Sequence, residues 1–161
     1  MLRSSTELIQ RSLRTYVPVI ESLVTAPAEL WTLDADGYDE AAIELLLGFA
    51  SRLRPALHEG ASDILVTKVM LGTFGCVPAF DSQFKKGFAA ATFGPKALRR
   101  IGRIYSDHAQ LVEAHRVGTL AFETGQATQR QYTRAQVIDM VFFTEGGNRG
   151  EPGRYPWASD A

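Results

Sequence analysis

One lysine, Lys68, lies within a nearly all-apolar stretch that runs from Ile64 to Phe74. On a helical wheel the apolar side chains cover almost the whole circumference, which is typical of a helix buried on all sides. An ammonium group in such surroundings must reach water, pair with a carboxylate or become neutral, because an unpaired buried charge is costly. Lys68 is therefore the first candidate for a functional residue.

Two interpretations of Lys68 remain open. In the structural interpretation its side chain reaches past one thin side of the helix to water, or forms an ion pair with Asp63 or Asp81. Such arrangements are common, and they make this interpretation the favoured one. In the chemical interpretation Lys68 lines a pocket, where its amine serves as a nucleophile or a base.

The residues around Lys68 also resemble a known family. The run Thr67-Lys68-Val69 is followed by further apolar helix and by Val77-Pro78-Ala79-Phe80-Asp81, all within about residues 60–84. This arrangement resembles the lysine and aspartate signature of the helix-hairpin-helix DNA glycosylases. The resemblance implies that Lys68 attacks a sugar carbon and that Asp81 supports the departing base. The chain departs from the family at Gly60-Ala61-Ser62-Asp63, which stands in place of a Gly-x-Gly hairpin.

A cluster of positive charge follows this segment, and no acidic residue lies between Asp81 and Asp107. Its six members, called the basic cluster below, are Lys85, Lys86, Lys96, Arg99, Arg100 and Arg103. The aromatic residues interleaved with them are Phe84, Phe88, Phe93 and Tyr105. Such a surface can hold a phosphate backbone and stack a base, which makes nucleic acid a candidate partner. The alternative is a solvated basic face whose aromatic rings point into the core.

The remaining candidate residues do not form a recognisable site. His108 and His115 lie on one helical face, but valine occupies position 112 between them, so no metal site is expected. Cys76 is interpreted as a small buried hydrophobe rather than a reactive thiol. No Walker loop, Rossmann glycine set, H-E-x-x-H or G-x-S-x-G motif is present, so no cofactor is expected.

Helical periodicity dominates the elements that must position these residues. The sequence predicts an all-α fold, a compact bundle of about six helices around the central apolar helix 64–74, with little or no sheet. The predicted helices span about 8–24 (kinked or split at Pro18), 38–53 (stopped by Pro55), 64–74, 82–91, 95–116 and 133–145. Ser4-x-x-Glu7 and Thr133-x-x-Gln136 match the capping-box pattern at two helix starts. For residues 118–131 the sequence does not distinguish a helix from a packed loop.

Size, composition and charge predict one folded unit without a membrane segment. The chain has 161 residues, of which 45% are apolar and 22% charged, and its formal net charge is -1. We expect one helical domain over residues 1–147 and an extended or frayed tail over 148–161. A single cysteine, a start without signal-peptide character and the lack of a long apolar run predict a cytoplasmic protein.

The helix predicted at 133–145 is apolar beyond one stripe. It is either a second core helix or a surface partly covered by another subunit, as in a homodimer. Two functional hypotheses remain. The first is a nucleic-acid-associated protein that acts through Lys68, Asp81 and the basic cluster, joined by one cleft. The second is a non-catalytic interaction or regulatory module, such as a bacterial accessory or toxin–antitoxin-type component, in which Lys68 is structural. Whether the protein is an enzyme is not decided by the sequence.

Overall fold

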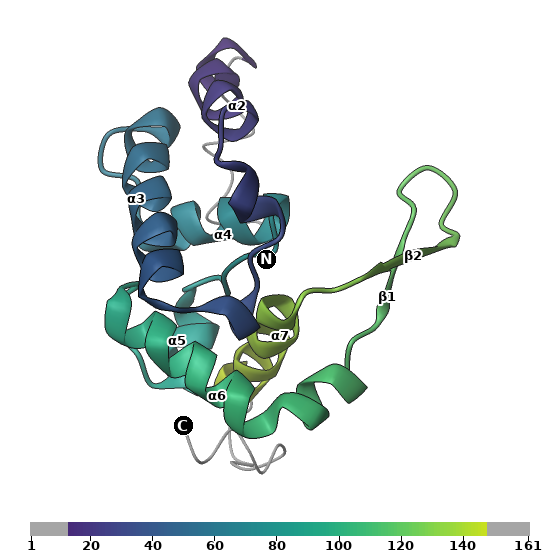
Figure 1. The fold of residues 1–161 in the computed structure, drawn as a ribbon. Coiled ribbons are helices and arrows are strands. Elements are labelled where there is room, and N and C mark those ends of the chain that lie inside the picture. The colour runs from purple at the N-terminus through teal and green to yellow at the C-terminus, as the bar shows by residue number, and fades with distance from the viewer. Residues whose placement is uncertain (1–12, 148–161) are drawn as a thin grey trace.

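The structure, a computed structural model, describes residues 13–147 and is mostly helical (Figure 1). Its α-helices are α2 (Val17–Val24), α3 (Glu40–Leu57), α4 (Asp63–Thr73), α5 (Ser82–Phe88), α6 (Pro95–Ala114) and α7 (Arg134–Gly147). Short 3-10 turns are η1 (Leu13–Tyr16), η2 (Ala28–Trp31) and η3 (Ala35–Gly37), and the strands are β1 (Gly118–Leu120) and β2 (Ala127–Gln131). The expected mainly helical class is confirmed. The capping pattern at Ser4 and the tail 148–161 lie outside the described residues.

The core is built on a cluster of aromatic side chains from α5, α7 and the loop before α5. Its fully buried large members are Phe80, Phe84, Phe88 and Phe142. The Phe84 and Phe88 rings stack at 5.1 Å, and the Phe142 ring meets the Phe88 ring edge-on at the same distance. Aromatic contacts of this kind add to the free energy gained by burying the rings. The densest packing therefore joins α5 to α7.

Helix α4 is not buried on all sides, so that prediction was wrong. Its fully buried side chains are Val66, Thr67 and Met70, whereas Lys68 and Gly72 are exposed. The other apolar side chains of α4 are half-buried. A helix that is apolar all round can thus lie at a surface when its partly covered side chains line a pocket, as Leu71 does.

Most helix starts were predicted correctly, because capping is local. Ser62 and Asp81 accept hydrogen bonds from the first turns of α4 and α5, and Thr133 and Gln136 form a reciprocal capping box before α7. Two helix ends were wrong. Helix α3 continues through Pro55 to Leu57, and α5 ends at Phe88 rather than at residue 91.

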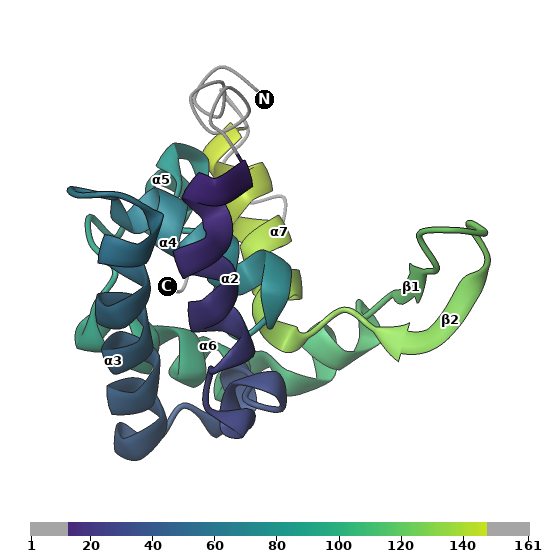
Figure 2. The ribbon, with the colours of Figure 1, turned by 90° about the horizontal axis from the view of Figure 1, so that it is seen from above.

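The segment left open at 118–131 is an antiparallel hairpin. Gly118 pairs with Gln131 and Leu120 with Ala127. Both views show the hairpin as an arm that projects away from the helices (Figures 1 and 2). Phe122, in the loop between the strands, is fully exposed. None of the described helices is both long and apolar enough to cross a bilayer.

Candidate functional site

Lys68 and Asp81 meet in the structure. Lys68 Nζ lies 3.4 Å from Asp81 Oδ2, and the lysine side chain is 44% exposed against 15% for the aspartate. The other oxygen of Asp81, Oδ1, accepts hydrogen bonds from the backbone N–H groups of Gln83 and Phe84 at the start of α5. Asp63, the alternative partner, instead pairs with Arg54 at 2.6 Å. Lys68 therefore shows both arrangements of the structural interpretation, because it pairs with a carboxylate and also reaches water.

The loop that delivers Asp81 to Lys68 is buried over residues 74–80, although loops usually lie at the surface. Side chains from distant elements bind its carbonyl groups. Tyr38 Oη donates to the Cys76 carbonyl at 2.5 Å, and Thr133 Oγ1 donates to the Gly75 carbonyl at 2.7 Å. These bonds satisfy backbone acceptors that water does not reach.

The N–H groups at the far end of the same loop are also bound by side chains. Thr67 Oγ1, on the buried side of α4, accepts from the Phe80 N–H at 2.9 Å. Asp139 Oδ1, on α7, accepts from the Ala79 N–H at 2.7 Å. Because α4 and α7 both hold the loop, the position of Asp81 relative to Lys68 is set by two helices.

A pocket of about 400 Å³, here called the Lys68 pocket, lies beside the ion pair. Its lining is mainly apolar, and it consists of Lys68, Leu71, Ala79, Asp81, Asp139, Met140, Phe143 and Thr144. Three charged groups thus converge in an otherwise apolar setting, which is the usual character of a binding site.

Asp139 is a member of this site that the sequence analysis missed. Burial is the largest cause that raises the pKa of Asp139, to about 6; the Asp81 charge also raises it, whereas the Ala79 N–H and Lys68 lower it. A carboxyl group with this pKa can exchange protons near neutral pH. The signal that drew attention to Lys68 was present here as well, because Asp139 lies between Ile138 and Met140 in an apolar stretch.

The basic cluster lies on α5 and α6, and part of its charge is neutralised. Arg99 forms a two-pronged ion pair with Glu40, at 2.6 and 2.7 Å. The guanidinium of Arg100 lies 4.5 Å above the Phe88 ring. Lys85 and Lys86 lie in the last turn of α5, while Lys96 and Arg103 are exposed on α6.

The aromatic residues within the basic cluster point inward. Phe84 and Phe88 are fully buried, and the half-buried Phe93 packs 5.2 Å from Phe80. The ring of the half-buried Tyr105 faces the guanidinium of Arg134 at 5.3 Å. The interpretation in which Phe84 and Phe88 stack on bases was therefore wrong, since neither ring is accessible.

A second pocket, of about 570 Å³, lies at the start of α6 and is called the α6 pocket. Three members of the basic cluster, Lys96, Arg99 and Arg100, line it together with Ala90, Ala91, Thr92, Gly94, Pro95 and Ala97. This pocket has no lining residue in common with the Lys68 pocket. The structure thus does not join Lys68, Asp81 and the basic cluster in a single pocket.

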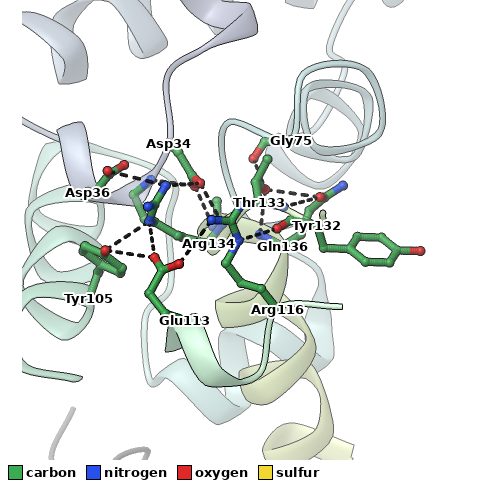
Figure 3. A network of polar contacts seen from close by, with 12 residues as sticks. Asp34, Asp36, Gly75, Tyr105, Glu113, Arg116, Tyr132, Thr133, Arg134 and Gln136 are labelled. Carbon is green, nitrogen blue, oxygen red and sulfur yellow. Dashed lines mark hydrogen bonds and ion pairs between the residues drawn. The ribbon is translucent and has the colours of Figure 1, made fainter. Parts of the chain in front are cut away.

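A polar network that shares no labelled residue with the lining of either pocket surrounds Arg134 at the start of α7 (Figure 3). Arg134 pairs with Glu113 at 2.6 Å and with Asp34 and Asp36 at 3.4 Å each, and it donates to Tyr105 Oη. Asp34 is buried and accepts from the backbone N–H groups of Arg134 and Ala135. The network holds α7 against η3 and α6, so we interpret it as structural.

Cys76 is buried, and desolvation raises the pKa of its thiol to about 12, which fits its interpretation as a small hydrophobe. Among residues 13–147, no three histidine, cysteine, aspartate or glutamate side chains are grouped so that they can hold a metal ion.

Comparisons of this chain with protein families, with curated proteins and with solved structures give no match.

Proposed function

We propose that this protein is a nucleic-acid-associated protein in which Lys68 and Asp81 act as a reactive pair. The observation that carries the proposal is the 3.4 Å contact between Lys68 Nζ and Asp81 Oδ2 at the edge of the Lys68 pocket. An exposed amine that is oriented by a carboxylate beside an apolar pocket is suited to attack a bound electrophile. The resemblance of residues 60–84 to the DNA glycosylases supports the same assignment.

The α6 pocket supplies the phosphate contacts in this proposal. Lys96 and Arg100 line it, and Arg103 is exposed further along α6. Lys85 follows Asp81 by four residues, so it lies on the same side of α5 one turn further from the Lys68 pocket. The cationic side chains contact backbone phosphates, while bases are not stacked by Phe84 or Phe88 because both rings are buried.

Binding of labelled single- and double-stranded DNA and RNA across a salt series tests the nucleic-acid assignment. We expect affinity to fall with salt, and Lys96→Gln to weaken binding and lower the salt slope by about one unit. Arg52→Gln is the matched control, because it removes the same positive charge from an exposed side chain on α3. Absence of salt-dependent binding at low ionic strength contradicts the proposal.

Borohydride trapping on DNA that contains an abasic site tests the amine. We expect a covalent adduct with the wild-type protein and none with Lys68→Ala. Lys68→Arg is the sharper variant, because it keeps the charge opposite Asp81 but offers no nucleophilic amine. An adduct of equal yield with Lys68→Arg contradicts the reactive role of Lys68.

The second candidate is a non-catalytic interaction module, and the exposed apolar residues favour it. Leu120 and Phe122 are exposed on the projecting hairpin, and Met140 is 42% exposed on α7. In this proposal Lys68 is structural and a second copy of the chain covers Met140, which would give the homodimer considered for 133–145. Because Met140 also lines the Lys68 pocket, such a dimer and a bound substrate exclude each other.

Sedimentation of the wild-type protein and of Met140→Asp separates the two candidates. A concentration-dependent dimer that Met140→Asp abolishes supports the module. A monomer at all concentrations contradicts a dimer through α7. Shortening the hairpin between Gly118 and Gln131 then tests the other apolar surface, since partner binding through Phe122 should be lost while the helical body stays folded.

A further inference from the structure

We propose that Asp139 is the acid–base group of the Lys68 pocket and that the ligand of this pocket carries an aldehyde or ketone group. The inference rests on the proposed function, in which Lys68 acts as an amine. It adds a residue from a different helix, α7, to the Lys68–Asp81 pair, and it specifies the chemical class of the electrophile.

The position of Asp139 supports this role. Its carboxylate reaches into the Lys68 pocket from α7, and Oδ1 is held by the Ala79 N–H at 2.7 Å. Among the described residues, the second oxygen, Oδ2, has no hydrogen-bond donor. One oxygen therefore orients the carboxyl group while the other is available to a ligand.

The charged groups that face Asp139 are Lys68 from α4 and Asp81 from the start of α5. The other side chains that line the pocket are uncharged, namely Leu71, Ala79, Met140, Phe143 and Thr144. The two charges act on Asp139 in opposite directions, because Asp81 raises its pKa and Lys68 lowers it. Burial is the largest cause, and the pKa of Asp139 is raised to about 6.

Asp81 is less suited to proton transfer than Asp139. Its Oδ1 accepts two backbone N–H groups and its Oδ2 faces the Lys68 ammonium. Both oxygens of Asp81 are therefore already engaged by groups of the fold. In the proposed division of roles, Asp81 orients Lys68 and Asp139 moves the proton.

The reaction is imine formation, and it balances without a further reactant. A water molecule in the pocket passes one proton from the Lys68 ammonium to the Asp139 carboxylate, and the free amine attacks the carbonyl carbon. The nitrogen then passes a proton to the former carbonyl oxygen, which gives a carbinolamine. Asp139 returns its proton to the hydroxyl group, which leaves as water while the C=N bond forms. The products are a protonated imine on Lys68, ionised Asp139 and one water.

Reductive labelling with benzaldehyde and cyanoborohydride, followed by peptide mapping, tests this inference on the full chain. The chain contains four lysines, so the exposed Lys86 and Lys96 serve as references in the same sample. In the wild-type protein we expect Lys68 to be labelled faster than both references, with a rate that changes slope near pH 6. Asp139→Asn keeps an acceptor for the Ala79 N–H, and we expect it to slow Lys68 labelling about 100-fold without changing the references.

The outcomes separate this inference from the proposed function. If Lys68 is labelled no faster than Lys86 and Lys96, its role as an amine fails, and the inference fails with it. If Lys68 is labelled fast in both proteins with the same pH dependence, the assignment of Asp139 is overturned while the amine role stands. Should Asp139→Asn not fold, the wild-type profile decides alone, because a rate without a change of slope near pH 6 overturns the assignment.

Discussion

Asp34 is the carboxylate on which the start of α7 depends. It is 8% exposed, and its oxygens accept the backbone N–H groups of Ala35, Arg134 and Ala135 within 2.8 Å. The first N–H groups of a helix have no partner within the helix, so Asp34 supplies partners that water does not. Its negative charge also complements the positive end of α7.

Asp34→Ala should therefore lower the free energy of unfolding by about 3–5 kcal/mol, because the backbone N–H groups of Ala35, Arg134 and Ala135 lose their acceptor and Arg134 loses its most buried carboxylate partner. Asp36→Ala is the matched control. Asp36 is 42% exposed and contacts Arg134 at 3.4 Å, so its loss should cost below about 1 kcal/mol. Urea unfolding of both variants measures the difference, and equal losses would contradict the role assigned to Asp34.

The contact between Lys68 and Asp81 could be predicted because its signal lies in the local sequence. A charge within an apolar helix was enough to select Lys68, and Asp81 was selected from the turn that follows. Asp34 was not selected from the sequence, because its partners Arg134 and Ala135 lie about 100 residues further along the chain. Asp139 has the same local signal as Lys68, a charge in an apolar stretch, but its pairing with Ala79 spans 60 residues and could not be predicted.

At the scale of elements, two glycines allow α5 and α7 to touch through their backbones. A Cβ atom at Gly87 would lie 2.1 Å from the Phe142 carbonyl oxygen, and one at Gly146 would lie 1.8 Å from that of Gln83. Neither distance is possible for real atoms, and backbone cannot move aside as a side chain can. These glycines are thus required by packing and not by backbone conformation.

Gly87→Ala and Gly146→Ala should each destabilise the protein by about 3 kcal/mol or more, because overpacking separates the two helices. Gly48→Ala is the control, since Gly48 lies within α3 with open space around it. There the helix propensity of alanine should stabilise the protein by up to about 1 kcal/mol. Thermal unfolding compares the three variants. A neutral effect of Gly87→Ala would show that α5 and α7 pack differently.

Helix starts were easier to predict than helix ends. Thr133 and Gln136 lie three residues apart and cap α7 from within one turn, so the pattern is complete in the sequence. Pro55 was expected to stop α3, yet the helix continues to Leu57, whose side chain is buried in the core. The hairpin was not predicted, because few of its side chains are buried and it lacks an alternating apolar face.

Over the whole molecule, the raised pKa of Asp139 links stability to pH. The folded state binds this proton more tightly than the unfolded chain, whose aspartate has a pKa near the ordinary value of 3.8. The contribution of Asp139 to stability is therefore present below about pH 4 and is lost as pH rises to about 6. A shift of this size corresponds to at most about 3 kcal/mol.

The measurement compares the wild-type protein with Asp139→Asn by urea unfolding at several pH values. The stability of the wild-type protein relative to the variant should fall between about pH 4 and 6 and stay constant above that range. Taking the difference between the two proteins removes the contributions of the other carboxyl groups. A difference that does not change with pH would contradict the burial-driven shift at Asp139.

Residue patterning alone determined that the chain is mostly helical, where several of its helices begin and that Lys68 and Asp81 are candidate partners in one site. These properties depend on periodicity and capping, which act within a few residues of the chain. Only the tertiary structure decided that Asp139 joins the pair, that α4 is open on one side and that three members of the basic cluster line a separate pocket. Those properties depend on which distant helices pack together. Local sequence patterns do not determine that packing, because they extend over only a few residues.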